Sequence, residues 1–390
     1  MARRWHRKNS VFNLRRGGGG ERHDFKDDGR AEVHARRSRL AYLPASRPAP
    51  PRHSCVRILW DGLFNARSSL GILSSELTAA LTTRHAVYAL PWPESEGALP
   101  PGVTRHSGET VDVAVRVCDP HSATLGLWRE RAGRAKLSLP FLYFDEVRLD
   151  AALARALGER CPDLLVFSRF TSAMLLAAGV RSRIEVVPLG VKLPDDISPR
   201  CEREPGPCAF VAAGYLDARK GIAPLVRAFA AEFGGDARAR LTLKSVGNHP
   251  YAFADVPNVV YDGRLLDRRE WFALLGQHDY FVAPTRMESF GMIGLEAAAV
   301  GTAIVYPMLS AYAAYANNVP SSVALVRGAW SDAAPAGWAV DEDELRGALR
   351  HLVDSHAYGY DRKAVAAAAA RHTWARSAEI FEDVVTRILA

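Results

Sequence analysis

The amino-acid sequence predicts an α/β protein with two consecutive domains, each built on a parallel sheet. Three observations support this prediction. The chain of 390 residues is too long for one ordinary domain and suits two. Short apolar runs typical of buried strands alternate with segments of helical spacing in both halves. A proline-rich segment at residues 192–207 separates the two series and is predicted to be a linker.

Residues 1–52 differ in composition from the rest of the chain. They contain a run of four glycines and carry a net charge of +9, whereas the remaining residues carry −2. Such a segment buries too little apolar surface to offset its ordering entropy, so we predict a disordered basic tail. The alternatives are an arm for nucleic acid or anionic lipid, and upstream sequence translated from a wrong start. Because the body is nearly neutral, we expect no nucleic-acid partner.

The cysteines and the lengths of the apolar runs indicate the cellular compartment in which the protein works. The five cysteines form no CxxC pair, which favours reduced thiols in a cytosolic setting, with pairing of Cys201 and Cys208 as the alternative. No run of about 18 apolar residues is present, and the amino terminus lacks the apolar core of a secretory signal. We therefore expect a cytoplasmic protein, and peripheral contact with a membrane stays open.

The first domain is predicted at residues 53–191. Residues 56–60 form an apolar run suited to a buried strand, and residues 70–82 place leucines on one helical face. Residues 87–90 complete a strand–helix–strand unit, which implies a parallel sheet with helices on its faces. Further strands are expected at residues 111–117, 141–144, 164–167 and 184–188, with a helix at residues 171–178 that Gly179 ends.

The second domain is predicted at residues 208–373 and repeats this alternation. Residues 208–213 suit a strand, and residues 222–233 a helix with Pro224 in its first turn. Further strands are expected at residues 241–245, 259–261, 280–283 and 303–306, and helices at residues 268–275, 291–300 and 374–390. Residues 341–344 are acidic and are predicted to cap a helix rather than to bind a metal. A cleft between two such domains is the expected ligand site.

The densest chemical signal lies at residues 284–296. Residues 284–291 read Pro-Thr-Arg-Met-Glu-Ser-Phe-Gly, and a second glutamate, Glu296, follows inside the next helix. The free N–H groups and positive dipole at the start of that helix form an anion site, for which a diphosphate is the natural ligand. Gly291 permits close backbone approach, and the two carboxylates can accept hydrogen bonds from hydroxyl groups. Glu296 also needs a polar partner because its helix is small and apolar.

A second signal lies between the first strand and helix of the second domain. Residues 213–221 end in Arg-Lys-Gly, which places the Lys220 ammonium where phosphate charge would lie. Both segments follow the carboxyl ends of predicted strands, where open α/β sheets bind ligands. The sequence therefore predicts one anion site built from two loops.

With these motifs, residues from about 55 to 390 resemble the glycosyltransferases of family four, whose fold is GT-B. Residues 284–297 match the family's Glu-x-Phe-Gly…Glu segment, and residues 184–191 match the end of its first domain. The family usually has Gly-Arg where this chain has Gly214-Tyr215, and Arg219 is a candidate substitute at a different position. The resemblance also implies that the terminal helix crosses back onto the first domain.

The resemblance assigns roles to individual residues. It implies that Glu288 binds the donor sugar as a catalytic residue, that Glu296 binds the ribose and that Lys220 binds the diphosphate. The predicted donor-binding residues are Lys220, Arg219, Gly214, Ser289, Phe290, Gly291, Met292, Leu295, Glu296 and Gly71.

In the first domain, Asp119, His121 and Asp145 are candidates for the residue that faces the reacting carbon. Each could equally be an ordinary polar loop residue. Arg116 lies on a strand predicted to be buried, so it requires an anionic partner. It is either structural or in contact with the acceptor.

Together these observations predict a retaining, metal-independent transfer of a hexose from a UDP- or GDP-sugar to a hydroxyl group. No cofactor is expected beyond the nucleotide-sugar co-substrate, and the acceptor is a carbohydrate, a lipid or a natural product. The alternatives are a nucleotide-sugar epimerase or disaccharide phosphorylase of the same fold, and a catalytically silent nucleotide-sugar-binding protein.

Overall fold

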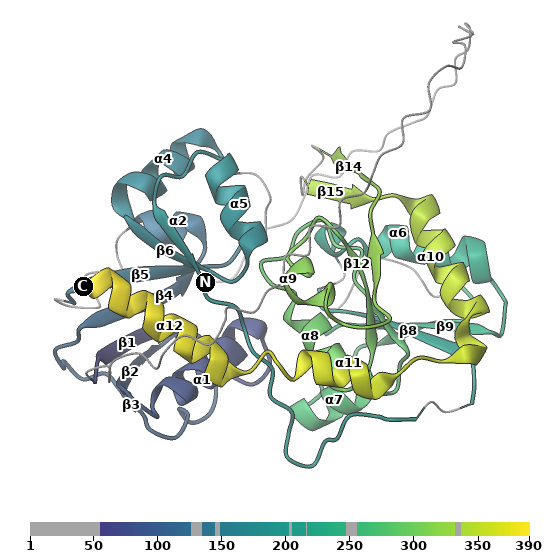
Figure 1. Ribbon diagram of the computed structural model, residues 1–390, viewed down its shortest axis with the longest axis horizontal. Helices are drawn as coiled ribbons and strands as arrows, with labels where there is room; N and C mark the ends of the chain where they lie inside the picture. Colours follow the sequence, from purple (N-terminus) through teal and green to yellow (C-terminus); the bar gives the residue numbers. More distant parts are fainter. Residues whose placement is uncertain are drawn as a thin grey trace, which may run out of the picture. The chain divides into compact units, whose positions relative to one another are not determined.

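The computed structural model describes residues 55–125, 135–144, 149–202, 205–215, 217–246, 256–331 and 337–390. The predicted tail at residues 1–52 and the candidate Asp145 lie outside these residues. Two parallel sheets with helices on their faces dominate the described chain, which confirms the predicted fold class (Figure 1). We call the part built on the first sheet the amino-terminal half and the part built on the second sheet the carboxy-terminal half.

The amino-terminal half contains a seven-stranded parallel sheet in the order β3-β2-β1-β4-β5-β6-β7. Its central strands are buried apolar runs because helices cover both faces. The strands are β1 (Arg57–Gly62), β2 (Ala86–Pro91), β3 (Val103–Arg105), β4 (Val113–Cys118), β5 (Leu137–Leu142), β6 (Asp163–Val166) and β7 (Arg183–Val186). The helices are α1 (Ser69–Leu81), α2 (Pro120–Leu125), α4 (Ala151–Arg160) and α5 (Arg169–Ala177).

The carboxy-terminal half contains a six-stranded parallel sheet in the order β10-β9-β8-β11-β12-β13. Its strands are β8 (Cys208–Ala213), β9 (Ala239–Lys244), β10 (Val259–Asp262), β11 (Tyr280–Val282), β12 (Ala303–Pro307) and β13 (Val323–Leu325). Its helices are η1 (Ala218–Lys220), α6 (Ile222–Phe233), α7 (Arg268–Gly276), α8 (Met292–Ala299), α9 (Ala313–Ala316), α10 (Glu342–Asp354), η2 (His356–Tyr358) and α11 (Arg362–Ala369). Asp341 caps α10 by accepting from Glu344 N at 2.8 Å, as predicted.

A small antiparallel hairpin and several short elements were not predicted. Strands β14 (Gly328–Ser331) and β15 (Gly337–Val340) form the hairpin, in which Trp330 and Trp338 pack edge to face. The sequence analysis also did not predict strand β3 and helices α4 and α11. Helices α4 and α11 are rich in alanine, so their sequences carry a weak contrast between buried and exposed faces.

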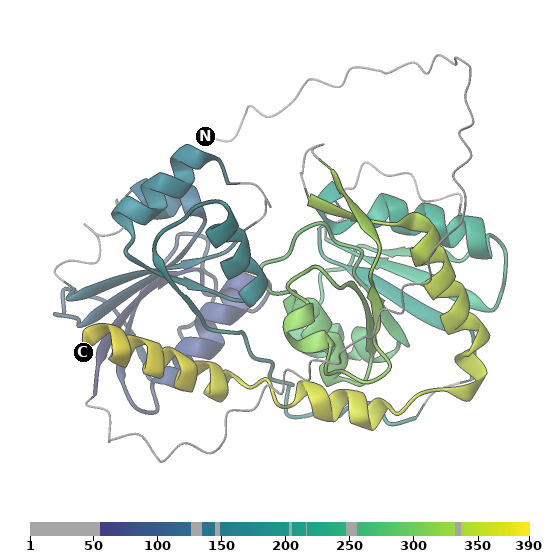
Figure 2. The same ribbon diagram turned by 45° about the horizontal axis from the view of Figure 1, so that its top comes forward.

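The last helix, α12 (Trp374–Leu389), packs against α1 in the amino-terminal half (Figure 2). Phe381 lies with its ring centroid 6.3 Å from that of Trp60 on β1, and the buried Glu382 pairs with Arg84 at 2.7 Å. The chain thus passes between the halves twice. The two crossings are adjacent, because Val191 N donates to His372 O at 2.8 Å.

Two further expectations concern cysteines and membranes. All five cysteines are free thiols, and Cys201 is exposed whereas Cys208 is buried. Among the residues that the structure describes, no helix has both the length and the apolar character needed to cross a bilayer.

Candidate functional site

The two loops predicted to bind an anion lie together at the carboxyl ends of neighbouring strands, β8 and β11. The backbone carbonyl of Arg219 accepts hydrogen bonds from Arg286 N at 2.8 Å and from the Thr285 hydroxyl at 2.9 Å. Gly221, with φ of +67°, packs so closely that a side chain there would collide with the carbonyl oxygen of Pro284. The two loops therefore contact each other directly, as the sequence predicted.

Three charged side chains meet at this junction. The Glu288 carboxylate pairs with the Lys220 ammonium, and its Oε1 lies 3.5 Å from an Arg219 guanidinium nitrogen. Arg219 also donates to the Met287 carbonyl at 3.3 Å. The Lys220 side chain lies against Gly214, where φ is +114° and an added Cβ would be 3.3 Å from Lys220 Cε. Arg219 thus joins Lys220 beside Glu288, although it is displaced along the chain from the family's usual arginine.

Helix α8 begins beside these charges at Gly291. Gly291 has φ of +84°, in the left-handed region, and supplies no side-chain cap to the helix. An added Cβ there would be 2.6 Å from the ring of Tyr312, and the Tyr315 hydroxyl donates to the Gly291 carbonyl at 2.5 Å. Only glycine fits this turn. Its lack of a side chain is what we expect at a helix start where a ligand must approach the backbone amides. The neighbouring Phe290, Met292 and Leu295 are buried, and Leu295 is part of the core.

The second glutamate, Glu296, is buried and has the partners that its environment requires. Its carboxylate accepts a hydrogen bond from Trp271 Nε1 at 2.8 Å and pairs with Arg268 at 2.7 Å. Both partners lie on α7, and Arg268 also stacks over the ring of Phe272 at 4.6 Å. No local pattern identified Arg268 or Trp271, because the contact joins two helices more than twenty residues apart in the sequence.

The two glutamates share one environment around Tyr315. Burial raises the pKa of Tyr315 well above its usual value, and the nearby Tyr312, Glu288 and Glu296 raise it further. Two cations and the Glu288 carboxylate thus lie beside the uncapped start of α8, and Glu296 lies inside that helix.

The segment around Glu288 also contacts the amino-terminal half. The Ser289 hydroxyl accepts from Phe144 N at 2.6 Å and donates to Phe144 O at 3.0 Å, while the Ser289 carbonyl accepts from the Thr171 hydroxyl at 3.2 Å. Met287 is buried in a hydrophobic cluster whose other members belong to the amino-terminal half. The side chain of Ser289, a predicted donor-binding residue, is thus hydrogen-bonded to the backbone of Phe144.

The candidates in the amino-terminal half are used within local structure. Asp119 accepts from the backbone N–H and the hydroxyl of Ser122 at the start of α2. Burial opposes ionisation of Asp119, but these hydrogen bonds outweigh it and hold its pKa below the usual value. His121 is exposed on α2, and Gly71 N donates to the Ser68 hydroxyl, which caps α1.

Arg116, the partly buried arginine of β4, has the anionic partner that the sequence required. Arg116 pairs with Asp61 of the neighbouring strand β1 at 2.8 Å, and Trp92 Nε1 donates to the other oxygen of Asp61 at 3.0 Å. Asp61 is 2% exposed. The arginine therefore balances a buried carboxylate at the carboxyl edge of the first sheet.

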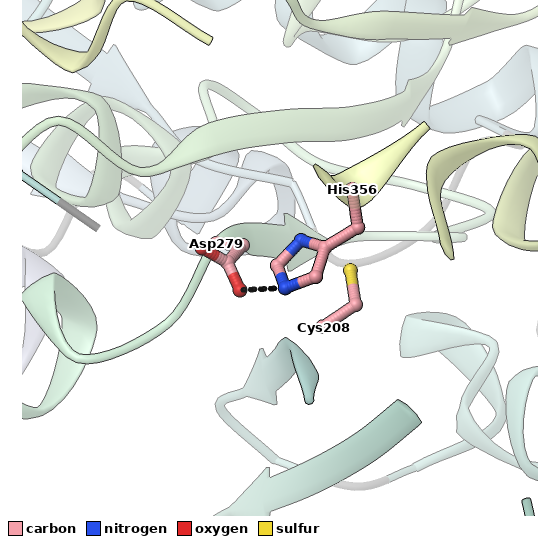
Figure 3. A group of neighbouring side chains, drawn as sticks. All are labelled: Cys208, Asp279 and His356. Carbon is pink, nitrogen blue, oxygen red and sulfur yellow. Dashed lines mark ion pairs between the residues drawn. The ribbon is translucent and has the colours of Figure 1, made fainter. Parts of the chain in front are cut away.

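A group of metal-binding residue types lies at the opposite edge of the second sheet. Cys208, Asp279 and His356 point toward one another, and His356 Nε2 lies 3.9 Å from Asp279 Oδ2 (Figure 3). Both carboxylate oxygens of Asp279 are engaged, one by Ala209 N at 2.9 Å and the other by the buried Arg362 at 3.0 Å. The guanidinium already balances the carboxylate charge, so we interpret this group as an anchor of β8, β11 and α11.

Comparisons with known proteins agree with this geometry. Residues 207–326 match the model of the family described as Glycosyl transferases group 1. A search of curated protein sequences finds no match. The fold is shared by sucrose-phosphate synthase from Thermosynechococcus elongatus, which is 13% identical with a TM-score of 0.64 over 86% of this chain and 99% of that one.

Two further solved structures have the same fold. Anabaena HepE in complex with UDP and glucose is 12% identical, with a TM-score of 0.62 over 85% of this chain and 100% of that one. A trehalose-6-phosphate protein from E. coli bound with UDP-2-fluoro glucose is 13% identical, with a TM-score of 0.62 over 85% and 99%. Residues 207–326 of this chain thus match a group 1 glycosyltransferase domain, and its two parallel-sheet halves have the GT-B fold.

Proposed function

We propose that this protein is a glycosyltransferase, which moves a hexose from a UDP- or GDP-sugar to a hydroxyl acceptor with retention of configuration and without a metal ion. The observation that carries the proposal is the pairing of Glu288 with Lys220 and Arg219 beside the uncapped start of α8. Two cations and free backbone N–H groups at one point match the charge and geometry of a diphosphate.

The pairing suggests how donor binding prepares the carboxylate. A diphosphate binds the same two cations that Glu288 holds, so donor and carboxylate compete for them. When the diphosphate takes Lys220 and Arg219, the Glu288 carboxylate is released to accept hydrogen bonds from the sugar hydroxyls. Glu296 lies inside α8, and we assign it to the ribose hydroxyls of the nucleotide.

The same charges can assist the chemical step. The bond between the anomeric carbon and the diphosphate breaks while the acceptor oxygen attacks from the same face, and the acceptor proton passes to the leaving phosphate. Negative charge grows on the leaving group, where Lys220, Arg219 and the amides of α8 lie. Charges that are already in place stabilise such a transition state strongly. They supply the positive charge that a metal ion supplies in other enzymes, which supports metal independence.

A transfer assay tests the proposal. The purified protein is incubated with UDP- and GDP-hexoses and a panel of sugar, lipid and natural-product acceptors, with and without EDTA. UDP-glucose is the first donor to test because HepE binds UDP and glucose. We expect a glycoside of retained anomeric configuration and equal rates with EDTA. An epimerised donor or phosphate-dependent cleavage would indicate one of the alternative enzymes. A protein that binds the nucleotide but neither transfers the sugar nor slowly hydrolyses the donor would be a silent binding protein.

A further inference from the structure

Ser289, the residue after Glu288, connects the loop at residues 284–291 to the amino-terminal half of the molecule. Ser289 is 9% exposed, and its hydroxyl makes two hydrogen bonds with the backbone of Phe144 just after β5. A serine that accepts from a backbone N–H and donates to the carbonyl of the same residue replaces the pairing that another strand would provide. The side chain therefore serves the junction between the halves.

The contact continues on the other side of the peptide. The Ser289 carbonyl accepts from the Thr171 hydroxyl at 3.2 Å, and Thr171 is completely buried in the first turn of α5. The Thr171 hydroxyl is held in turn by the Ser168 side chain, which caps α5, at 3.0 Å. Three hydrogen bonds from a strand end and a helix start thus fix one residue.

Glu288 is held between this contact and another. On its amino-terminal side, Met287 is 1% exposed and packs with apolar residues of the amino-terminal half. Its own carboxylate pairs with Lys220 and Arg219 of the carboxy-terminal half. The side chains of the residues before and after Glu288 therefore contact the amino-terminal half, whereas the Glu288 carboxylate pairs with the carboxy-terminal half.

We propose that Ser289 is a positioning residue, which holds the Glu288 carboxylate in the place where it meets the donor sugar by binding Phe144 and Thr171. This inference rests on the proposed function, and it assigns Ser289 a role other than direct contact with the donor. Loss of the hydroxyl frees the loop to shift, and displacement of a catalytic group by about 1 Å can reduce the rate by about 100-fold. The diphosphate ligands Lys220 and Arg219 lie on a different loop, so nucleotide binding does not require this contact.

The test compares Ser289→Ala with Thr171→Val and with a matched control. Ser182 is similarly buried at 8% exposure and donates to a backbone carbonyl far from the donor loops, so Ser182→Ala controls for loss of a buried hydroxyl. Turnover is measured with the best donor found for the parent, and UDP affinity by calorimetry. We expect kcat to fall about 10- to 100-fold in Ser289→Ala and less in Thr171→Val, with UDP Kd unchanged. Ser182→Ala should match the parent, and Ser289→Thr should recover part of the rate.

Several outcomes would overturn the inference. Parental kcat in both Ser289→Ala and Thr171→Val would exclude the positioning role. A parallel loss of kcat and UDP affinity in folded Ser289→Ala would indicate that the serine contacts the donor. If Ser289→Ala does not fold, Thr171→Val decides, because valine keeps the shape of threonine. If the parent itself transfers no sugar from any donor, the proposed function fails, which is distinct from failure of this inference.

Discussion

The two halves have the same kind of sheet but use its carboxyl edge differently. In the amino-terminal half, polar groups at this edge make local contacts: Arg116 pairs with Asp61, Asn65 accepts from the backbone of Arg67 and Ser68, and Asp119 caps α2. In the carboxy-terminal half, two cations share one carboxylate beside an uncapped helix start. An anionic ligand can replace a shared carboxylate more readily than it can enter a closed network of caps. We therefore expect an anionic ligand to bind at the edge of the second sheet, where the charged side chains can exchange partners.

The largest expected effect comes from removing the carboxylate that the cations share. Glu288→Gln keeps the side-chain shape but removes the charge. We expect kcat for transfer to fall about 100- to 1,000-fold, because a neutral amide replaces the charged acceptor of the sugar hydroxyls. UDP should bind several-fold more tightly, because the diphosphate no longer competes with a carboxylate for Lys220 and Arg219. Steady-state rates and calorimetry measure both changes, and Glu379→Gln, at a half-exposed glutamate of α12, is the control. Weaker UDP binding in Glu288→Gln would contradict the exchange of partners.

The next effect comes from removing one of the cations. Lys220→Met keeps the apolar stem and deletes the ammonium, so UDP should lose a charge-assisted hydrogen bond. We expect Kd for UDP to rise about 10- to 100-fold. Lys136→Met removes a lysine of the amino-terminal half that is 71% exposed and should leave Kd unchanged. An equal Kd in parent and Lys220→Met would remove Lys220 from the donor site.

A smaller effect is expected from the helix start itself. Gly291→Ala forces a side chain into the left-handed region and against Tyr312. The free energy of unfolding should fall by about 1–3 kcal/mol, as measured by denaturant titration. Gly347→Ala on α10, where an added Cβ meets open space, is the matched control and should stabilise slightly. Equal stability of parent and Gly291→Ala would show that the turn tolerates side chains.

The smallest effect should come from the amino-terminal half and would sharpen the comparison. Ser68→Ala removes the cap of α1 and should cost about 1 kcal/mol of stability. Because its hydroxyl is used within the loop, UDP affinity should stay at the parental value. A clear rise in Kd would mean that the loop before α1 contacts the donor after all, as the prediction for Gly71 supposed.

Much of the fold follows from local pattern. Strand β8, helix α6 and helix α12 lie where the sequence predicted them, because each has strong periodicity and a clear boundary such as Pro224 or the cap Thr373. Short edge strands such as β3 and the hairpin of Trp330 and Trp338 carry too few residues for a period to appear. These strands form because they pair with another strand, and the local sequence pattern does not reveal that pairing.

The contact between the two charged loops of the candidate site could be predicted from the sequence, but the residues that support these loops could not. Glycines and charges next to strand ends predicted the loops at Lys220 and Glu288, because elementary geometry brings such ends together. The partners of Glu296 on α7 depend on how two helices pack. The contact of Ser289 with Phe144 depends on how the two halves meet, and serine in this motif looks locally like any polar loop residue.

The two adjacent crossings of the chain have a mechanical consequence. Gly190 passes so close to the backbone of Thr373 and Trp374 that no side chain fits between them, and Val191 is hydrogen-bonded to His372. The two covalent connections between the halves therefore touch at this point. A side chain at position 190 would push both connections apart and break the hydrogen bond that joins them.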